Sequence, residues 1–117
     1  MLEQENREKW QKIVRFVRDK FSDGEEPDLD NIIFLVGLRE IGLPYRRYKK
    51  DEKLDLLHIA ICRLLMPYGF YERDGQDQEG WPHYKLVKKL PPLKAGEQSI
   101  LMKEALIRYF DEEVWEA

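Results

Sequence analysis

Residues 51–68, DEKLDLLHIAICRLLMPY, are the stretch that most constrains how this chain can fold. On a helical wheel of about 100° per residue, six apolar side chains fill one wide arc and four more are scattered through the opposite arc. The first group is Ala60, Leu64, Leu57, Ile61, Leu54 and Leu65, and the second is Leu56, Ile59, Cys62 and Met66. A helix that is apolar on most sides is usually buried on most sides. We therefore expect this helix to be the structural centre, with any function on the loops around it.

Two helices are predicted before this central one. The first is amphipathic and ends near Phe21 or Ser22, with one apolar face made by Trp10, Ile13, Val14, Val17 and Phe21. The second covers roughly residues 29–41, between Asp28 as an N-cap and Gly42 as the residue that ends it. Gly37 lies inside the second helix and indicates close backbone approach to a neighbour, for which the central helix is the natural candidate.

After the central helix, which Pro67 and Gly69 end, the pattern changes to that of a hairpin. Residues 70–73 and 82–87 are predicted strands, residues 74–80 a polar loop, and residues 90–96 an extended linker. A last helix follows, apolar over more than half of its circumference. Its apolar residues are Ile100, Met102, Ala105, Leu106, Ile107, Tyr109, Phe110 and Val114. For the tail that contains Trp115, both fraying and folding back stay open.

The pattern predicts a mainly α (α+β) fold: four helices with one two-stranded antiparallel β-hairpin between the third and fourth, in a single domain over residues 1–117. The chain has 20 Lys and Arg residues against 23 Asp and Glu residues, a net charge of −3, which does not indicate a nucleic-acid or membrane surface overall. The longest apolar run, residues 32–38, is far shorter than the roughly 20 residues that span a bilayer.

The expected location is the cytoplasm. The first eleven residues are acidic and polar, unlike a signal peptide, so we expect no targeting sequence. Cys62 is the single cysteine, so no disulfide can form within the chain, and its position in the most apolar helix is typical of a buried thiol in a reducing compartment.

No pattern in the sequence predicts catalysis, a metal site or a cofactor. Asp55, His58 and Cys62 share one edge of the central helix, but one cysteine and two separated histidines, His58 and His83, lack the spacing of a zinc site. The chain has two serines and no threonine, neither serine lies in a nucleophile elbow, and there is no glycine-rich phosphate motif. The loop 74–80 lacks the ligand set of a calcium site.

Residues 51–87 resemble the helix and wing of winged-helix domains. In that family a glycine after the third helix leads into a strand, an arginine-bearing loop and a returning strand. Here those places are taken by Gly69, Phe70, Arg73, Tyr84 and Leu86. The resemblance implies a DNA-binding role, with the central helix in the major groove. The residues of that helix do not favour the role, because Lys53 and Arg63 stand among several acids, and the wing loop is acidic.

The competing hypothesis is a binding or scaffold domain that acts through a protein partner or through self-association. Its support is a set of aromatic residues beside cations, the residue types that anchor interfaces. The candidate binding residues are Tyr45, Arg46, Arg47, Tyr48, Lys50, Trp81, His83 and Tyr84, and we call these eight the predicted patch. The alternative is that most of these aromatic rings cap the edges of the core.

Overall fold

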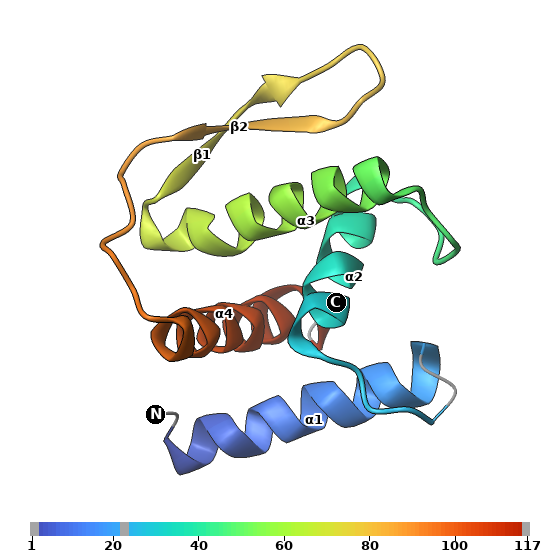
Figure 1. Cartoon of the computed structure of the whole chain (residues 1–117), viewed down its shortest axis with the longest axis vertical. Helices are drawn as coiled ribbons and strands as arrows, with labels where there is room; N and C mark the ends of the chain where they lie inside the picture. The colour runs from blue at the N-terminus through green and yellow to red at the C-terminus, as the bar shows by residue number, and fades with distance from the viewer. Residues whose placement is uncertain (1–2, 22–23, 116–117) are drawn as a thin grey trace. The chain divides into compact units, whose positions relative to one another are not determined.

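A computed structural model describes residues 3–21 and 24–115. The described residues form α1 (Gln4–Phe21), α2 (Leu29–Ile41), α3 (Lys50–Leu65), the short 3₁₀ helix η1 (Met66–Tyr68), β1 (Tyr71–Gln76), β2 (Pro82–Leu86), α4 (Ala95–Tyr109) and the π-helical turn η2 (Phe110–Val114) (Figure 1). Four helices with an antiparallel hairpin between the third and fourth are what the sequence predicted, so the fold class is confirmed. Among the described helices, none has the length and apolar character that crossing a membrane requires.

The chain divides into two compact units. Residues 30–91 form one, which holds α2, α3 and the hairpin, and the described residues of 1–29 and 92–117 form the other, which holds α1, α4 and η2. The prediction of a single domain stays a prediction.

Within residues 30–91, helix α2 lies against α3 at Gly37. A methyl group added at Gly37 would overlap the backbone carbonyl of Leu56 in α3, so the predicted close approach of these two helices is confirmed. Beside this contact, Phe34, Leu38 and Leu56 form a buried cluster. Gly42 ends α2 as predicted, with a φ of 86° and its amide donating to the Leu38 carbonyl at 2.8 Å. Burial of the cluster is what holds α2 and α3 together.

The hairpin lies along α3, and both strands contact that helix (Figure 1). Its register pairs Glu72 with Lys85 and Arg73 with Tyr84. The predicted first strand, residues 70–73, was wrong in its length, because β1 continues to Gln76. The register shifts between Arg73 and Gln76, where Gly75 has a φ of 73°, and this irregularity carries pairing past the residues expected to be loop.

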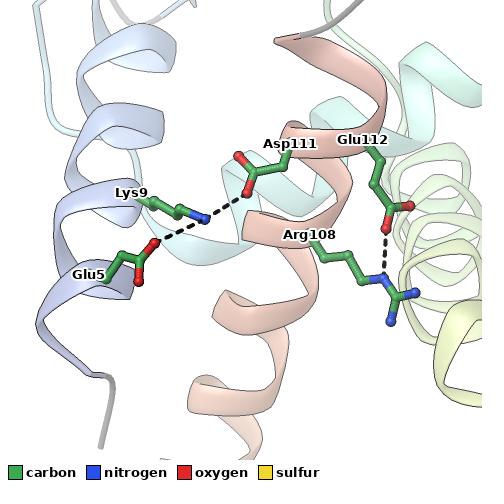
Figure 2. Close-up of polar contacts among 5 residues, drawn as sticks. All are labelled: Glu5, Lys9, Arg108, Asp111 and Glu112. Atoms are coloured by element: carbon green, nitrogen blue, oxygen red, sulfur yellow. Dashed lines mark hydrogen bonds and ion pairs between the residues drawn. The ribbon is translucent and has the colours of Figure 1, made fainter.

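In the other unit, α1 and α4 pack side by side. The apolar face predicted for α1 is buried at Trp10, Ile13, Val14 and Val17. On the surface, the Lys9 ammonium lies 3.0 Å from Asp111 and 3.8 Å from Glu5, and Arg108 pairs with Glu112 at 2.8 Å (Figure 2). Of these pairs, only Lys9–Asp111 links α1 to the C-terminal segment, and exposed ion pairs of this kind contribute little to stability.

Helix α4 starts earlier than the sequence suggested. The linker was expected to reach residue 96, but the Glu97 carboxylate accepts the backbone amide of Lys94 at 3.0 Å and starts the helix at Ala95. At its other end, the Trp115 amide donates to the Phe110 carbonyl at 2.8 Å, a π-type bond. The Trp115 ring folds back on Phe16, with ring centroids 5.0 Å apart.

Candidate functional site

The structure brings the two halves of the predicted patch together through their aromatic residues. Tyr48, in the loop between α2 and α3, and Trp81, just before β2, both pack against the cluster of Phe34, Leu38 and Leu56. Both rings are half-buried. They therefore act first as core-edge residues, and their packing fixes the loop and the hairpin turn beside one another.

The loop is held by contacts of Tyr48. Its ring meets Phe34 edge-on, with centroids 5.9 Å apart, and its hydroxyl donates to the Pro44 carbonyl. The Arg46 guanidinium stacks 3.9 Å above the same ring and donates to the Arg47 carbonyl at 2.8 Å. A buried ring thus fixes the conformation of an exposed arginine.

Five cations at this end of α3 are exposed: Arg46, Arg47, Lys49, Lys50 and Lys53. Over the part of the chain that the structure describes, none of the five lies within ion-pair distance of a carboxylate, whereas Lys85 pairs with Glu72 at 3.1 Å on the hairpin. The Glu52 carboxylate, which could have balanced them, accepts the Lys49 backbone amide at 3.1 Å at the start of α3. The result is a stretch of five exposed cations, with the acids Asp51 and Asp55 beside them on α3, in which no cation forms an ion pair within the described residues.

Two large apolar side chains lie exposed within the same stretch. Tyr45 is 57% exposed and Leu54 is 55% exposed. Leu54 was expected in the buried arc of the central helix, and that expectation was wrong. The side that is buried in the first half of α3 carries Leu56 and Ile59, because α2 and the hairpin cover it. Leu54 thus lies one turn from Lys50 and next to Lys53.

We call the exposed side chains of this stretch the basic loop surface. It consists of Tyr45, Arg46, Arg47, Lys49, Lys50, Lys53 and Leu54. Sequence reasoning missed Leu54, although its position among charged residues in the first turns of the helix was a signal of exposure. The basic residues and Tyr45 of the loop could be predicted, because many charged residues lie close together in a segment where a proline prevents a helix.

The hairpin members of the predicted patch point in different directions. Neighbouring strand residues face opposite sides, and in β2 His83 is exposed while Tyr84 is half-buried. His83 lies 3.5 Å from Asp77. Tyr84 faces the side of Glu40, which pairs with Arg63 at 3.4 Å. Burial, and then the nearby Glu40 carboxylate, raise the pKa of the Tyr84 hydroxyl. Tyr84 is thus separated from the basic loop surface.

The turn beside Trp81 is acidic and closely hydrogen-bonded. One Asp77 carboxylate oxygen accepts the amides of Glu79 and Trp81, both at 2.9 Å. The bond from the Trp81 amide is the main cause that lowers the pKa of the Asp77 carboxyl. Because Asp77 and Glu79 are exposed, the turn places negative charge close along the chain to Trp81, which packs on the same cluster as Tyr48.

Comparisons with protein-family models, with curated proteins and with solved structures each found no match. The chemistry of the described residues is therefore the basis for assigning a site. His58 and Cys62 lie close, with the sulfur 3.6 Å from the ring nitrogen, but within the described ranges no three His, Cys, Asp or Glu side chains gather as metal ligands. On α3 the exposed cations Lys50 and Lys53 alternate with the acids Asp51 and Asp55.

Proposed function

We propose that this chain is a small protein-binding domain and that the basic loop surface is its binding site. The observation that carries the proposal is the anchoring of the loop: Tyr48 packs against the buried cluster and holds Arg46 by stacking. A surface that is rigid before binding loses less conformational entropy when a partner docks. Tyrosine and arginine are also the residue types that most often dominate the energy of an interface.

The partner is another protein or a second copy of this chain. A nucleic-acid partner is the alternative, and it is less well supported because acids alternate with cations on α3 and because Asp77 and Glu79 lie on the neighbouring turn. We place this function in the cytoplasm, a proposal that rests on Cys62 as a fully buried, unpaired cysteine.

Photo-cross-linking tests this proposal. A benzophenone amino acid replaces Tyr45 in the chain, which is expressed in cells where it occurs naturally, and the matched control carries the same group at the exposed Gln11 of α1. We expect a discrete protein adduct from position 45 and none from position 11. An adduct of twice the 14.1 kDa chain mass identifies self-association, and a different mass identifies another protein. No adduct from position 45, or adducts from both positions, would refute the proposal.

A further inference from the structure

The basic loop surface combines two features that together specify the chemistry of a partner. One is the set of five cations that have no ion-pair partner among the described residues. The other is the pair of exposed apolar side chains, Tyr45 and Leu54, that lie among them. A ligand that matches both must carry negative charges with apolar side chains between them.

We propose that the basic loop surface binds an acidic peptide segment that carries apolar or aromatic anchor residues. This inference rests on the proposed function and names its partner class. Charge complementarity supplies the attraction, because five cations outnumber the exposed acids Asp51 and Asp55 within residues 46–55, where Glu52 accepts the Lys49 amide. Tyr45 and Leu54 supply the apolar contacts, which a purely ionic ligand would leave in water.

The neighbouring turn decides between an acidic peptide and a nucleic acid. The Trp81 ring, which packs on the same cluster as Tyr48, is bonded through its backbone amide to Asp77 at 2.9 Å. The exposed acids Asp77 and Glu79 therefore lie on the turn that leads into this ring. A duplex presents phosphates across a wide face and would bring some of them against Asp77 and Glu79. A single peptide strand is narrow enough to stay on the cations.

The orientation of Arg46 prepares the surface for paired hydrogen bonds to an anion such as a carboxylate. Stacking on Tyr48 fixes one face of its guanidinium and leaves the edge donors defined in direction. A planar guanidinium held this way forms paired hydrogen bonds to a carboxylate, which a mobile lysine does not do. We therefore expect Arg46 to contribute to specificity and the lysines mainly to the rate of encounter.

Fluorescence anisotropy with a labelled peptide tests the inference. The probe is a nine-residue peptide with one tryptophan between two runs of four glutamates, and its control has glutamine in place of glutamate. We expect the acidic probe to bind and the glutamine peptide to bind at least about tenfold more weakly. Binding should weaken as sodium chloride rises from about 50 to 300 mM, because the charges are exposed to screening.

Two charge-matched variants locate the site. Arg47→Glu with Lys50→Glu reverses two cations of the basic loop surface, and neither side chain supports the loop. Lys88→Glu with Lys89→Glu makes the same charge change in the exposed linker. We expect the first variant to lose at least about tenfold in affinity and the second to change by less than about twofold. Leu54→Ala should weaken binding several-fold without changing the salt dependence. Circular dichroism before titration verifies that each variant is folded.

Three results would overturn the inference: no peptide binding at about 50 mM salt, equal losses in the two charge-reversed variants, or tighter binding of a mixed-sequence DNA duplex than of the peptide. If the peptide fails to bind while the cross-link from position 45 still forms, the protein-binding proposal stands and only the acidic partner is refuted. If the peptide does not bind and the cross-link does not form, both the protein-binding proposal and the acidic-partner inference are refuted.

Discussion

At Gly37 a single hydrogen in place of a methyl group sets how closely α2 and α3 pack. The space that a methyl group would occupy is filled by the Leu56 backbone carbonyl, and backbone cannot move aside as a flexible side chain can. The contact therefore depends on glycine for space and not for an unusual backbone angle. It also explains why a helix accepts a residue with poor helix propensity in its interior.

Replacing Gly37 by alanine should lower the free energy of unfolding by about 1 to 3 kcal/mol, because the helices must separate to admit the methyl group. Urea denaturation followed by circular dichroism measures this change. Gly96 is the matched control, since it lies in α4 with nothing near its added methyl group, and Gly96→Ala should instead stabilise the protein by about 0.5 to 1 kcal/mol. Equal stability of Gly37→Ala and the natural chain would contradict the packing described here.

Cys62 makes the free energy of unfolding depend on pH in the alkaline range. The thiol is fully buried, and desolvation raises its pKa from 9.0 to about 11. Because the folded protein holds this proton more tightly than the unfolded chain, the stabilisation is complete below pH 9.0 and is lost as pH rises towards 11. Burial therefore keeps the sulfur, which lies 3.6 Å from the His58 ring nitrogen, in its protonated form into the alkaline range.

We expect the free energy of unfolding to fall between about pH 9 and pH 11 by about 2 kcal/mol more in the natural chain than in Cys62→Ala. The alanine variant keeps the other groups that titrate in this range, including Tyr71 and Tyr84, so the difference reports the thiol together with the effect of its charge on those two hydroxyls. Urea titrations of both proteins at a series of pH values measure it. Parallel pH profiles would show that the thiol pKa is not raised by folding.

Among the elements, the hairpin depends most on one side chain in its turn. Asp77 accepts two backbone amides and its own amide donates to the Trp81 carbonyl at 3.0 Å, so the turn closes around this residue. Trp81 then enters the cluster beside Tyr48. The chemistry of the turn thus determines where the aromatic ring lies, and through it how the hairpin meets the loop.

Asp77→Ala should speed hydrogen exchange at the amides of Glu79 and Trp81, because both lose their acceptor. Two-dimensional NMR measures exchange amide by amide, and Asp74→Ala is the control on the same hairpin. The natural chain should show the same loosening on acidification, since the lowered pKa of Asp77 means that its contribution is lost as pH falls below 3.8. Unchanged exchange in Asp77→Ala would mean that the turn closes without the carboxylate.

At the scale of the whole molecule, the connectivity of the two units matters most. One unit is a continuous segment, residues 30–91, whereas the other is made from the two ends of the chain. Pairing of α1 with α4 therefore closes a loop that holds residues 30–91. We expect folding of that segment to reduce the entropy lost when the loop closes.

This connectivity predicts that the stability of the unit made from the two chain ends depends on residues 30–91, but not the reverse. Trp115→Ala removes the ring that packs on Phe16 and Phe110 and lies under the Lys12 ammonium, so exchange in α1 and α4 should rise by about tenfold or more. Exchange in α2 and α3 should change by less than about twofold. Gly37→Ala, which weakens the continuous unit, should instead speed exchange in both. Hydrogen exchange with mass spectrometry measures these rates, and equal effects of Trp115→Ala on both units would refute the coupling.

The sequence by itself determined the local elements. Helix spacing, proline and glycine signals and strand alternation located α1, α2, α3 and the hairpin, because these preferences act between residues that are close along the chain. The close approach at Gly37 was also predictable, since glycine destabilises the interior of a helix and its presence there indicates close packing. The length of β1 was not predictable, because it depended on an irregular register. The start of α4 was not predictable either, because it depended on the Glu97 carboxylate.

Only the tertiary structure decided which side of the central helix is buried and which part of the predicted patch is a surface. An apolar wheel with residues on both arcs does not say which of them the neighbours cover. Here they cover Leu56 on one arc and Leu64 on the other, and they leave Leu54 exposed. In the same way Tyr48 and Trp81 became core-edge residues, while Tyr45 and the cations stayed exposed. Burial is a property of what packs against a residue, and that is set by contacts far apart in the chain.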